Sequence, residues 1–304
     1  MTVFFSYLKK FPNIGKYLLK KMIEYNSGKL VGVDLGGSKV NVGMVEGTKI
    51  LRKKSKMLPD SQKDEKCVID LIINLIKKVI DNDIIEGICI GVPSLLDKKA
   101  GIVHDVLNIP SWKEVQLASV LKAEFGVSIL MENDANCFAL GEYYFGLGKR
   151  CENMVGITLG TGLGTGIISN NQIISGAYGG AGEFGMLSYK DGIIEDYCSG
   201  KFFKRYNTTG KLLKEKAIQG NLEALKIFDE FGSHLGHAVK TIMYTVNPDK
   251  IIIGGSIAKA AIFFDNSLKK SISDFSYKKI LKNLKIEYSC KPDIALLGAT
   301  SLYR

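Results

Sequence analysis

Residues 158–168 read Thr-Leu-Gly-Thr-Gly-Leu-Gly-Thr-Gly-Ile-Ile, and this stretch decides the fold expected for the chain. Four glycines alternate with threonine and leucine, and apolar, strand-like residues stand before and after them. Glycine permits positive φ angles and close approach of the backbone, and successive N–H groups in such a turn bind anions. The stretch therefore predicts a hairpin whose turn holds a phosphate. A glycine-rich β-turn without a ligand is the alternative.

Two common phosphate-binding motifs do not describe this stretch. Thr165 stands where G-x-G-x-x-G needs its last glycine, and G-x-x-x-x-G-K-[ST] occurs nowhere in the 304 residues. The turn also leads into a second apolar strand and not into a helix. A phosphate bound here would sit in a hairpin, unlike the phosphate of a Rossmann fold or a P-loop.

The same arrangement occurs earlier in the chain. Residues 30–34 predict a buried strand that ends on Asp34, Gly36 and Gly37 predict a turn, and two further strands follow over residues 40–45 and 50–56. The same order thus occurs twice, about one lobe apart: a strand, a glycine turn with hydroxyl and acidic groups, and a second strand. We expect two similar lobes, each contributing one phosphate loop.

The remaining pattern alternates between helices and buried strands, which predicts an α/β fold. Helices are expected over 63–82, 112–125, 134–145, 195–206, 212–218 and 222–246, from 257, and over 292–302; strands over 84–90, 127–131, 250–253 and 286–288. Gly232 and Gly236 lie on one helix face, where another backbone can pack closely. The expected lobes are residues 29–131 plus 291–304 (the smaller, N-terminal lobe) and 132–290 (the larger, C-terminal lobe), after a basic extension over 1–28.

Composition narrows the classes of function. The net charge of +10 comes mostly from scattered lysines, which suits an anionic ligand or a solubilising surface, and no arginine-rich or aromatic-interleaved patch points to nucleic acid. Six widely spaced cysteines without a C-x-x-C, and only three histidines, argue against a zinc site and a disulfide framework. No apolar run is long enough to span a bilayer, and the start does not resemble a signal peptide, so a cytoplasmic protein is expected.

The N-terminal extension has apolar residues at helical spacing with lysines between them. We expect an amphipathic segment packed on the body of the protein or on a second subunit. Binding to a membrane surface is the alternative.

Phosphoryl transfer needs anion cradles, a metal and a positioned base, and the chain offers candidates for the last two. Asp34 ends a strand beside the Gly36-Gly37-Ser38-Lys39 turn, where its carboxylate could hold Mg²⁺ directly or through water and Lys39 could neutralise phosphate. An Asx-type turn with a solvated lysine is the alternative. Asp134 is the candidate general base for a substrate hydroxyl. The alternative is that Asn133 or Asp134 only caps a helix.

Further polar residues could bind a sugar or a nucleotide. Glu183 lies in a loop of small residues, where its carboxylate can accept two sugar hydroxyls, and Asn108 and Glu195 are additional candidates. For Asn108 and Glu195 the alternatives are a turn residue and an acid at a helix start. Gly254, Gly255 and Ser256 follow a buried strand and suit an adenosine or phosphate contact, or simply a tight turn. His234 and His237 lie within a predicted helix and are expected to be surface or packing residues.

These motifs together resemble the ROK family of bacterial sugar kinases and sugar-responsive repressors, which has the actin/hexokinase/Hsp70-like fold. Seven motifs occur in the expected order: Asp34-Leu-Gly-Gly-Ser-Lys39, Gly91-Val-Pro93, Leu107-Asn-Ile-Pro-Ser-Trp112, Glu132-Asn-Asp-Ala-Asn136, Gly160-Thr-Gly-Leu-Gly164, Gly182-Glu-Phe-Gly185 and Gly254-Gly-Ser-Ile257. The resemblance runs from about residue 29 to the end of the chain.

The resemblance implies an ATP- and Mg²⁺-dependent hexose kinase, in which two ribonuclease-H-like lobes close on the sugar across an interlobe cleft. By motif position, Asp134 is the implied catalytic base. The implied sugar ligands are Asn108, Asn133, Glu183 and Glu195. The implied phosphate cradles are residues 34–39 and the loop of Gly160, Thr161, Gly162 and Gly164, and residues 254–257 touch adenosine. A homodimer is common among the relatives and is expected here.

Two departures from the family pattern bear on the substrate. Met186 stands where the family's Gly-Glu-x-Gly-His has its histidine, and the zinc-binding cysteine motif that follows is absent, with only Cys198 in residues 188–198. Methionine cannot donate a hydrogen bond to a hydroxyl. We therefore expect no zinc site and leave the sugar open among glucose, an N-acetylhexosamine (N-acetylglucosamine or N-acetylmannosamine) and fructose.

Two other functions stay open beside the sugar 6-kinase. A non-catalytic sugar sensor is permitted by the missing zinc motif. A ROK-type DNA-binding repressor would carry a winged-helix domain before the first strand, for which about 28 residues are too few.

Overall fold

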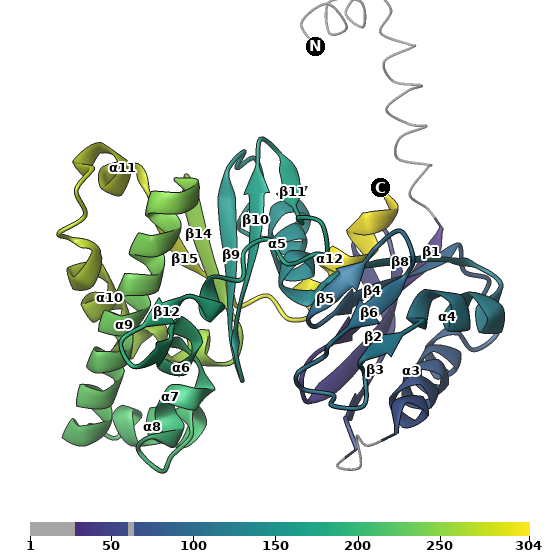
Figure 1. The fold of residues 1–304 in the computed structure, drawn as a ribbon, viewed down its shortest axis with the longest axis horizontal. Coiled ribbons are helices and arrows are strands. Elements are labelled where there is room, and N and C mark those ends of the chain that lie inside the picture. The colour runs from purple at the N-terminus through teal and green to yellow at the C-terminus, as the bar shows by residue number, and fades with distance from the viewer. Residues whose placement is uncertain (1–27, 60–63) are drawn as a thin grey trace, which may run out of the picture.

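Two five-stranded sheets organise the computed structural model, which describes residues 28–59 and 64–304 (Figure 1). The first sheet has the order β3-β2-β1-β4-β8 and the second the order β11-β10-β9-β14-β15. The strands of the first are β1 (Lys29–Leu35), β2 (Lys39–Glu46), β3 (Lys49–Met57), β4 (Gly87–Val92) and β8 (Ser128–Asn133). Those of the second are β9 (Met154–Leu159), β10 (Leu163–Ser169), β11 (Gln172–Ile174), β14 (Lys250–Gly254) and β15 (Lys285–Tyr288).

The two sheets repeat one another in strand direction as well as in order. In the first, β1 pairs antiparallel with β2 and parallel with β4, and β8 continues the parallel side. In the second, β9 pairs antiparallel with β10 and parallel with β14, and β15 continues that side. The predicted internal repeat is therefore confirmed at the level of the sheets.

Two helices pack against each other between the sheets: α5 (Asp134–Phe145) and α12 (Ile294–Thr300) (Figure 1). Their backbones touch closely, since a Cβ on Gly298 would lie 1.8 Å from the carbonyl oxygen of Cys137. On one side α12 lies on β1, where a Cβ on Gly32 would meet the Leu296 carbonyl oxygen at 2.7 Å. On the other side α5 lies on β10, where a Cβ on Gly166 would meet the Ala135 carbonyl oxygen at 2.6 Å. Glycines thus let the two sheets approach this helix pair.

Further helices cover the outer faces (Figure 1). The first sheet carries α3 (Glu65–Ile80) and α4 (Leu117–Phe125), and the second carries α6 (Ile194–Cys198), α7 (Gly200–Lys204), α8 (Gly210–Ile218), α9 (Leu222–Val246), α10 (Asp265–Ile272) and α11 (Lys278–Asn283). As predicted, Gly232 and Gly236 admit a neighbouring backbone, because Cβ atoms there would meet the carbonyl oxygens of Phe264 at 2.3 Å and Leu268 at 3.1 Å. Three 3₁₀ helices, η1 (Phe184–Met186), η2 (Ile257–Phe263) and η3 (Ser301–Tyr303), complete the described helices.

Two short sheets were not predicted. Strands β5 (Leu95–Asp97), β6 (Ile102–His104) and β7 (Glu114–Val115) form a three-stranded sheet beside β8, and β12 (Ser188–Tyr189) pairs with β13 (Gly192–Ile193). The first corrects the helix expected over 112–125, which begins only at Leu117. Val115 instead pairs with Val103, and the buried Trp112 donates its indole N–H to the Glu65 carbonyl. The apolar residues Trp112 and Val115 are three positions apart, a spacing that is compatible with a helix as well as with the short strand that the structure contains.

Three other boundaries also differ from the expectation. The helix expected over 195–206 breaks at the fully buried Ser199, whose hydroxyl accepts from the Lys201 N–H and caps a new helix. The strand expected from residue 84 begins at Gly87, and Ile84 is 91% exposed. The helix expected from residue 257 is first the 3₁₀ turn η2 and only then α10.

In the described residues, no helix is both long and apolar enough to cross a membrane. The amphipathic segment expected over 1–27 falls outside these residues and stays a prediction.

Candidate active site

The carboxyl ends of three parallel strands bring acidic residues into one row of the first sheet. The register pairs Asp34 on β1 with Gly91 on β4, and Gly91 with Glu132 on β8. Asn41 faces Asp34 across the β1–β2 hairpin, and its amide donates to Asp34 Oδ2 at 2.9 Å. Burial raises the pKa of Asp34, while the Asn41 hydrogen bond and the charge of Lys39 oppose the rise. We call Asp34, Gly91 and Glu132 the carboxylate row.

Asp134 is the first residue of α5 and lies directly beyond this row. Its backbone Cα lies 3.4 Å from the Cβ that Gly91 would carry, and its Oδ1 accepts from the Ala135 N–H at 2.8 Å. The pKa of Asp134 is raised to about 7, first by burial and then by the negative charges of Asp34 and Glu183. A carboxyl group with this pKa can take up a proton near neutral pH, as a general base must.

Asn133 is the N-cap of α5, as the alternative interpretation of this residue predicted. Its Oδ1 accepts from the N–H groups of Ala135 and Asn136 at 2.9 and 3.2 Å. Its amide nitrogen lies 3.4 Å from the carbonyl oxygen of Ser94. This amide donates to Ser94, so only its second N–H remains available for a ligand, and the cap fixes the direction in which Asp134 leaves the strand.

A second row, built from small residues, crosses the second sheet. The register places Thr158 on β9 between Gly164 on β10 and Gly254 on β14. The quoted stretch forms the β9–β10 hairpin, as predicted, and a Cβ on Gly164 would meet the Thr158 hydroxyl at 2.9 Å. Gly255 follows with φ +89°, and a Cβ there would lie 2.2 Å from the Leu159 carbonyl oxygen. We call Gly164, Thr158 and Gly254 the glycine row.

The glycines of the hairpin act through close contact and not through positive φ. None of the glycines from Gly160 to Gly166 has a positive φ angle, so the expectation that this turn needs positive φ is wrong. A Cβ on Gly162 would lie 2.4 Å from a Glu195 carboxylate oxygen. A Cβ on Gly160 would meet no protein atom of the described chain within 4 Å, so this glycine borders open space.

Glu195 holds the hairpin in place. One carboxylate oxygen accepts from the Leu163 N–H at 2.8 Å, and the other pairs with Lys201 Nζ at 2.8 Å. The pKa of Glu183 is raised, by burial first and by Glu195 second. Met186 ends the 3₁₀ turn that follows Glu183 and is 51% exposed.

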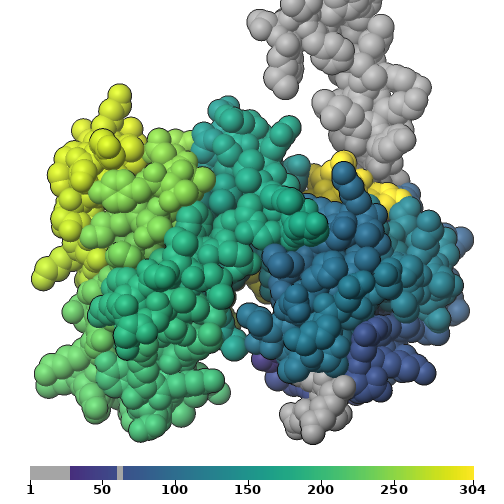
Figure 2. All heavy atoms as spheres, viewed as in Figure 1, coloured from purple at the N-terminus to yellow at the C-terminus, as the bar shows by residue number. Residues whose placement is uncertain are grey.

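The structure therefore brings most of the predicted residues together. Asp34 and Glu183 both raise the pKa of Asp134, and Glu195 raises that of Glu183, so these four carboxylates lie near one another. Asn108 lies beside the first glycine turn, since a Cβ on Gly37 would meet its amide nitrogen at 2.7 Å. His234 and His237 lie elsewhere and pack on Tyr189, as expected of packing residues. Figure 2 shows a deep indentation between the blue and green parts of the chain.

The described residues contain no group of three or more His, Cys, Asp or Glu side chains that could hold a metal ion. Mg²⁺ needs no such group, because it is usually held by one or two carboxylates together with substrate phosphates and water. Asp34 fits this requirement, since it is a partly buried carboxylate at the end of β1, beside the turn of Gly36 to Lys39.

Comparison with known proteins agrees with this architecture. The ROK family model matches residues 30–304. The chain belongs to the ROK family. A glucokinase from Thermotoga maritima is 31% identical over 310 residues, which cover 91% of this chain and 97% of the relative. A xylose repressor from Bacillus subtilis is 29% identical over 283 residues, which cover 85% of this chain and 73% of the repressor.

A solved structure has the same fold. A ROK family glucokinase from Streptomyces griseus, in complex with glucose and AMPPNP, superposes with a TM-score of 0.80 at 26% identity, covering 90% of this chain and 99% of that one. A sugar kinase structure from Cytophaga hutchinsonii gives a TM-score of 0.79, also at 26% identity. The fold is therefore the α/β actin/hexokinase-like fold that the motifs implied.

Two features of the site were not predicted from the sequence. Asn41 holds Asp34, and the hairpin register between Asp34 and Asn41 could have revealed it. Glu132 is 1% exposed and forms an ion pair with Lys98 on the β5–β6 turn. No local pattern links those two residues, because the small sheet that carries Lys98 was not predicted.

Proposed function

We propose that this ROK protein transfers the γ-phosphoryl group of ATP to a hexose, at the 6-hydroxyl of glucose or a related sugar. One observation supports this most strongly: Asp134 starts α5 beside Asp34 and Glu183, with a pKa raised to about 7. The similarity to glucokinases, one of them in complex with glucose and AMPPNP, supports the choice of sugar and nucleotide.

In the proposed reaction, Asp134 removes the proton from the sugar hydroxyl. The hydroxyl oxygen forms a bond to the γ-phosphorus while the bond from that phosphorus to the β,γ-bridging oxygen breaks, and ADP leaves. The proton resides on Asp134 until it passes to solvent. Mg²⁺, held by Asp34 directly or through water, would neutralise phosphate charge when bound.

We assign the remaining residues to the two substrates. The β9–β10 turn (Gly160, Thr161, Gly162 and Gly164) and the turn of Gly36, Gly37, Ser38 and Lys39 would hold phosphates. Gly254, Gly255 and Ser256 would contact adenosine. Asn108, Asn133 through the second N–H of its amide, Glu183 and Glu195 would bind sugar hydroxyls, with Met186 beside them.

The lobes that we propose to close on the sugar are residues 29–131 plus 291–304 and residues 132–290. This division places the two sheets in different lobes, apart from the last two residues of β8, and α5 and α12 lie along the junction. The homodimer and the cytoplasmic location expected from the sequence stay predictions.

An ADP-release assay with Mg-ATP tests the proposal directly. The panel contains glucose, fructose, N-acetylglucosamine and N-acetylmannosamine, each against a sugar-free background. We expect turnover with at least one sugar and its loss in Asp134→Ala. Asp229→Asn is the matched control, because Asp229 is an exposed acid on α9. ADP release no faster than background with every sugar would refute the kinase.

A sugar-responsive regulator is the second candidate, because the Bacillus subtilis xylose repressor is 29% identical. Saturable sugar binding without turnover would favour it, as it would a non-catalytic sugar sensor.

A further inference from the structure

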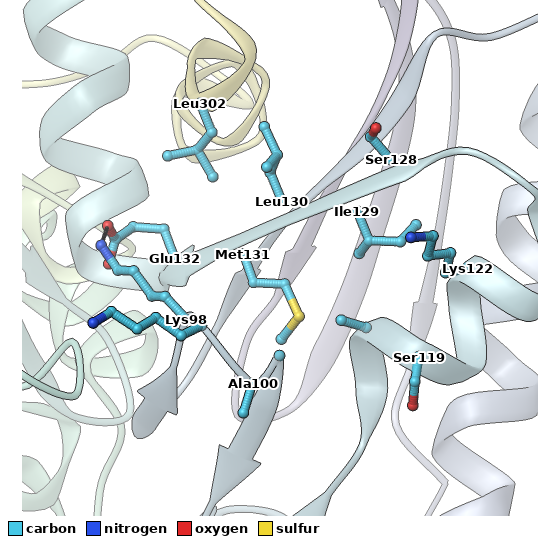
Figure 3. A pocket seen from close by; sticks show the side chains of 13 residues that line it. Lys98, Ala100, Ser119, Lys122, Ser128, Ile129, Leu130, Met131, Glu132 and Leu302 are labelled. Carbon is cyan, nitrogen blue, oxygen red and sulfur yellow. Dashed lines mark hydrogen bonds and ion pairs between the residues drawn. The ribbon is translucent and has the colours of Figure 1, made fainter.

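A pocket of about 580 Å³ lies along β8 and meets the site described above only at Glu132 and its partner Lys98 (Figure 3). β8 is the edge strand of the first sheet, so one side of its backbone has no neighbouring strand in that sheet. Ile129, Leu130 and Met131 line the pocket, together with Ala100 on the β5–β6 turn and Leu302 near the C-terminus. The volume falls within the range of about 300–1,000 Å³ typical of small-molecule sites.

The charged groups around this pocket are mainly positive. Lys98, Lys99 and Lys122 line it, against the single carboxylate of Glu132. Lys98 pairs with Glu132. Neither Lys99 nor Lys122 forms an ion pair with any residue in 28–59 or 64–304, so two positive charges remain uncompensated. Figure 3 shows Lys98 and Glu132 at one end of the pocket and Lys122 at the other, with the side chains of Ile129 and Met131 between them.

These surroundings select a class of ligand. Lysines at the rim favour phosphate or carboxylate groups, while the apolar middle favours an organic body over a bare inorganic ion. The serine hydroxyls of Ser119 and Ser128 lie at the Lys122 end and can add hydrogen bonds to an oxyanion.

Lys98 connects this pocket to the candidate active site. Glu132 Oε2 accepts from Lys98 Nζ and, at 2.8 Å, from the Ser175 hydroxyl that follows β11. Glu132 Oε1 accepts from the Asn133 N–H at 2.9 Å and from the Asn136 amide at 3.0 Å. The same carboxylate thus joins the pocket, the second sheet and the first turn of α5, where Asp134 lies.

We propose that this pocket binds a small organic anion carrying a phosphate or carboxylate group, and that its occupancy regulates sugar binding through Lys98. An anion at the Lys98 end competes with Glu132 for the ammonium group. Glu132 is 1% exposed and would then be a buried carboxylate without its cation, so the start of α5 must readjust. The binding step stands on the pocket alone, whereas the regulatory step rests on the proposed kinase function.

Hydrogen–deuterium exchange of the full chain tests the binding step. Glucose 6-phosphate and citrate are the probes, at constant ionic strength set with KCl. We expect saturable protection of residues 117–132, with affinity about tenfold weaker in K99M/K122M, as expected for the loss of charge-assisted contacts. K211M/K216M is the matched control, because it removes two exposed lysines of α8.

Two results would overturn the binding step: no saturable protection of 117–132 with either probe, or equal weakening in both double variants. Protection confined to the 158–166 hairpin would overturn it too, because the anion would then occupy the phosphate loop. These results do not depend on catalysis, so they are distinguishable from a failure of the kinase proposal.

Sugar KM measured with and without citrate, at fixed free Mg²⁺, tests the regulatory step, because glucose 6-phosphate is the product of the proposed reaction and would change KM at the active site. We expect the probe to change sugar KM severalfold in the native chain and to have no effect in K98M/E132Q, which removes both charges and so leaves no unpaired buried ion. A probe that binds yet leaves KM unchanged, or that acts equally in K98M/E132Q, would refute the coupling.

Discussion

In two sheets of the same topology, Asp34 on β1 and Gly91 on β4 correspond to Thr158 on β9 and Gly254 on β14, yet the carboxylate row and the glycine row carry opposite chemistry. The first presents Asp34 and Glu132, with Asp134 directly after it. The second presents Gly164, Thr158 and Gly254, with no charged side chain among them.

In the proposed reaction, this difference would separate two tasks that phosphoryl transfer requires. Removing a proton and attracting a metal need negative charge, whereas a triphosphate is repelled by carboxylates and is bound best by backbone N–H groups. A repeated scaffold thus provides one edge for each task. Variants that alter one row and spare the other can test the comparison.

Asp134→Asn should have the largest effect. The amide keeps the size of the side chain and cannot accept the sugar proton, so kcat should fall roughly 10²–10⁴-fold, the range for a lost general base. Sugar affinity, measured by calorimetry, should stay within a few-fold of the native value. A near-native kcat would show that Asp134, beside the carboxylate row, does not supply the base.

Gly160→Ala addresses the β9–β10 turn next to the glycine row and should have the next largest effect. A Cβ there meets no described atom within 4 Å, so the melting temperature should not change. Bound phosphates would occupy that space, and KM for ATP should rise about tenfold, the equivalent of roughly 1.4 kcal/mol. Sugar KM should remain as in the native chain. An unchanged KM for ATP would show that the phosphates do not bind at this turn.

Asn41→Ala should have the smallest effect, on the metal requirement. The variant removes the 2.9 Å hydrogen bond that holds Asp34 and favours its ionised form. The Mg²⁺ concentration for half-maximal rate should rise severalfold, as expected from the loss of one hydrogen bond to a charged group. Ser55→Ala is the control, because Ser55 donates to the same asparagine but does not touch Asp34. Equal shifts in both variants would argue against a role for Asp34 in metal binding.

The sequence predicted the strands and the glycine turns well because these depend on local patterns. The hairpin over 158–168, the long helix Leu222–Val246 and the close packing at Gly232 were all visible as periodicity or glycine spacing. The match of seven motifs in order predicted the family.

The remaining features depend on contacts between distant segments. The ion pair of Lys98 and Glu132 and the partnership of Glu195 with Leu163 join residues more than 30 positions apart. The short strands β5–β7 are set by pairing with each other, and the helical spacing of Trp112 and Val115 concealed them. Asn133 caps α5 and is also a candidate ligand, and only the backbone geometry shows that it is the cap.

The pH dependence of kcat/KM for the sugar tests the central claim most directly. Asp134 must be ionised to accept a proton, and its pKa is raised to about 7 by burial and by the charges of Asp34 and Glu183. The rate constant should therefore be low under acidic conditions and rise through a midpoint near pH 7, and Asp134→Asn should lack this rise. A midpoint near pH 4, or the same rise in Asp134→Asn, would contradict the assignment of Asp134 as the base.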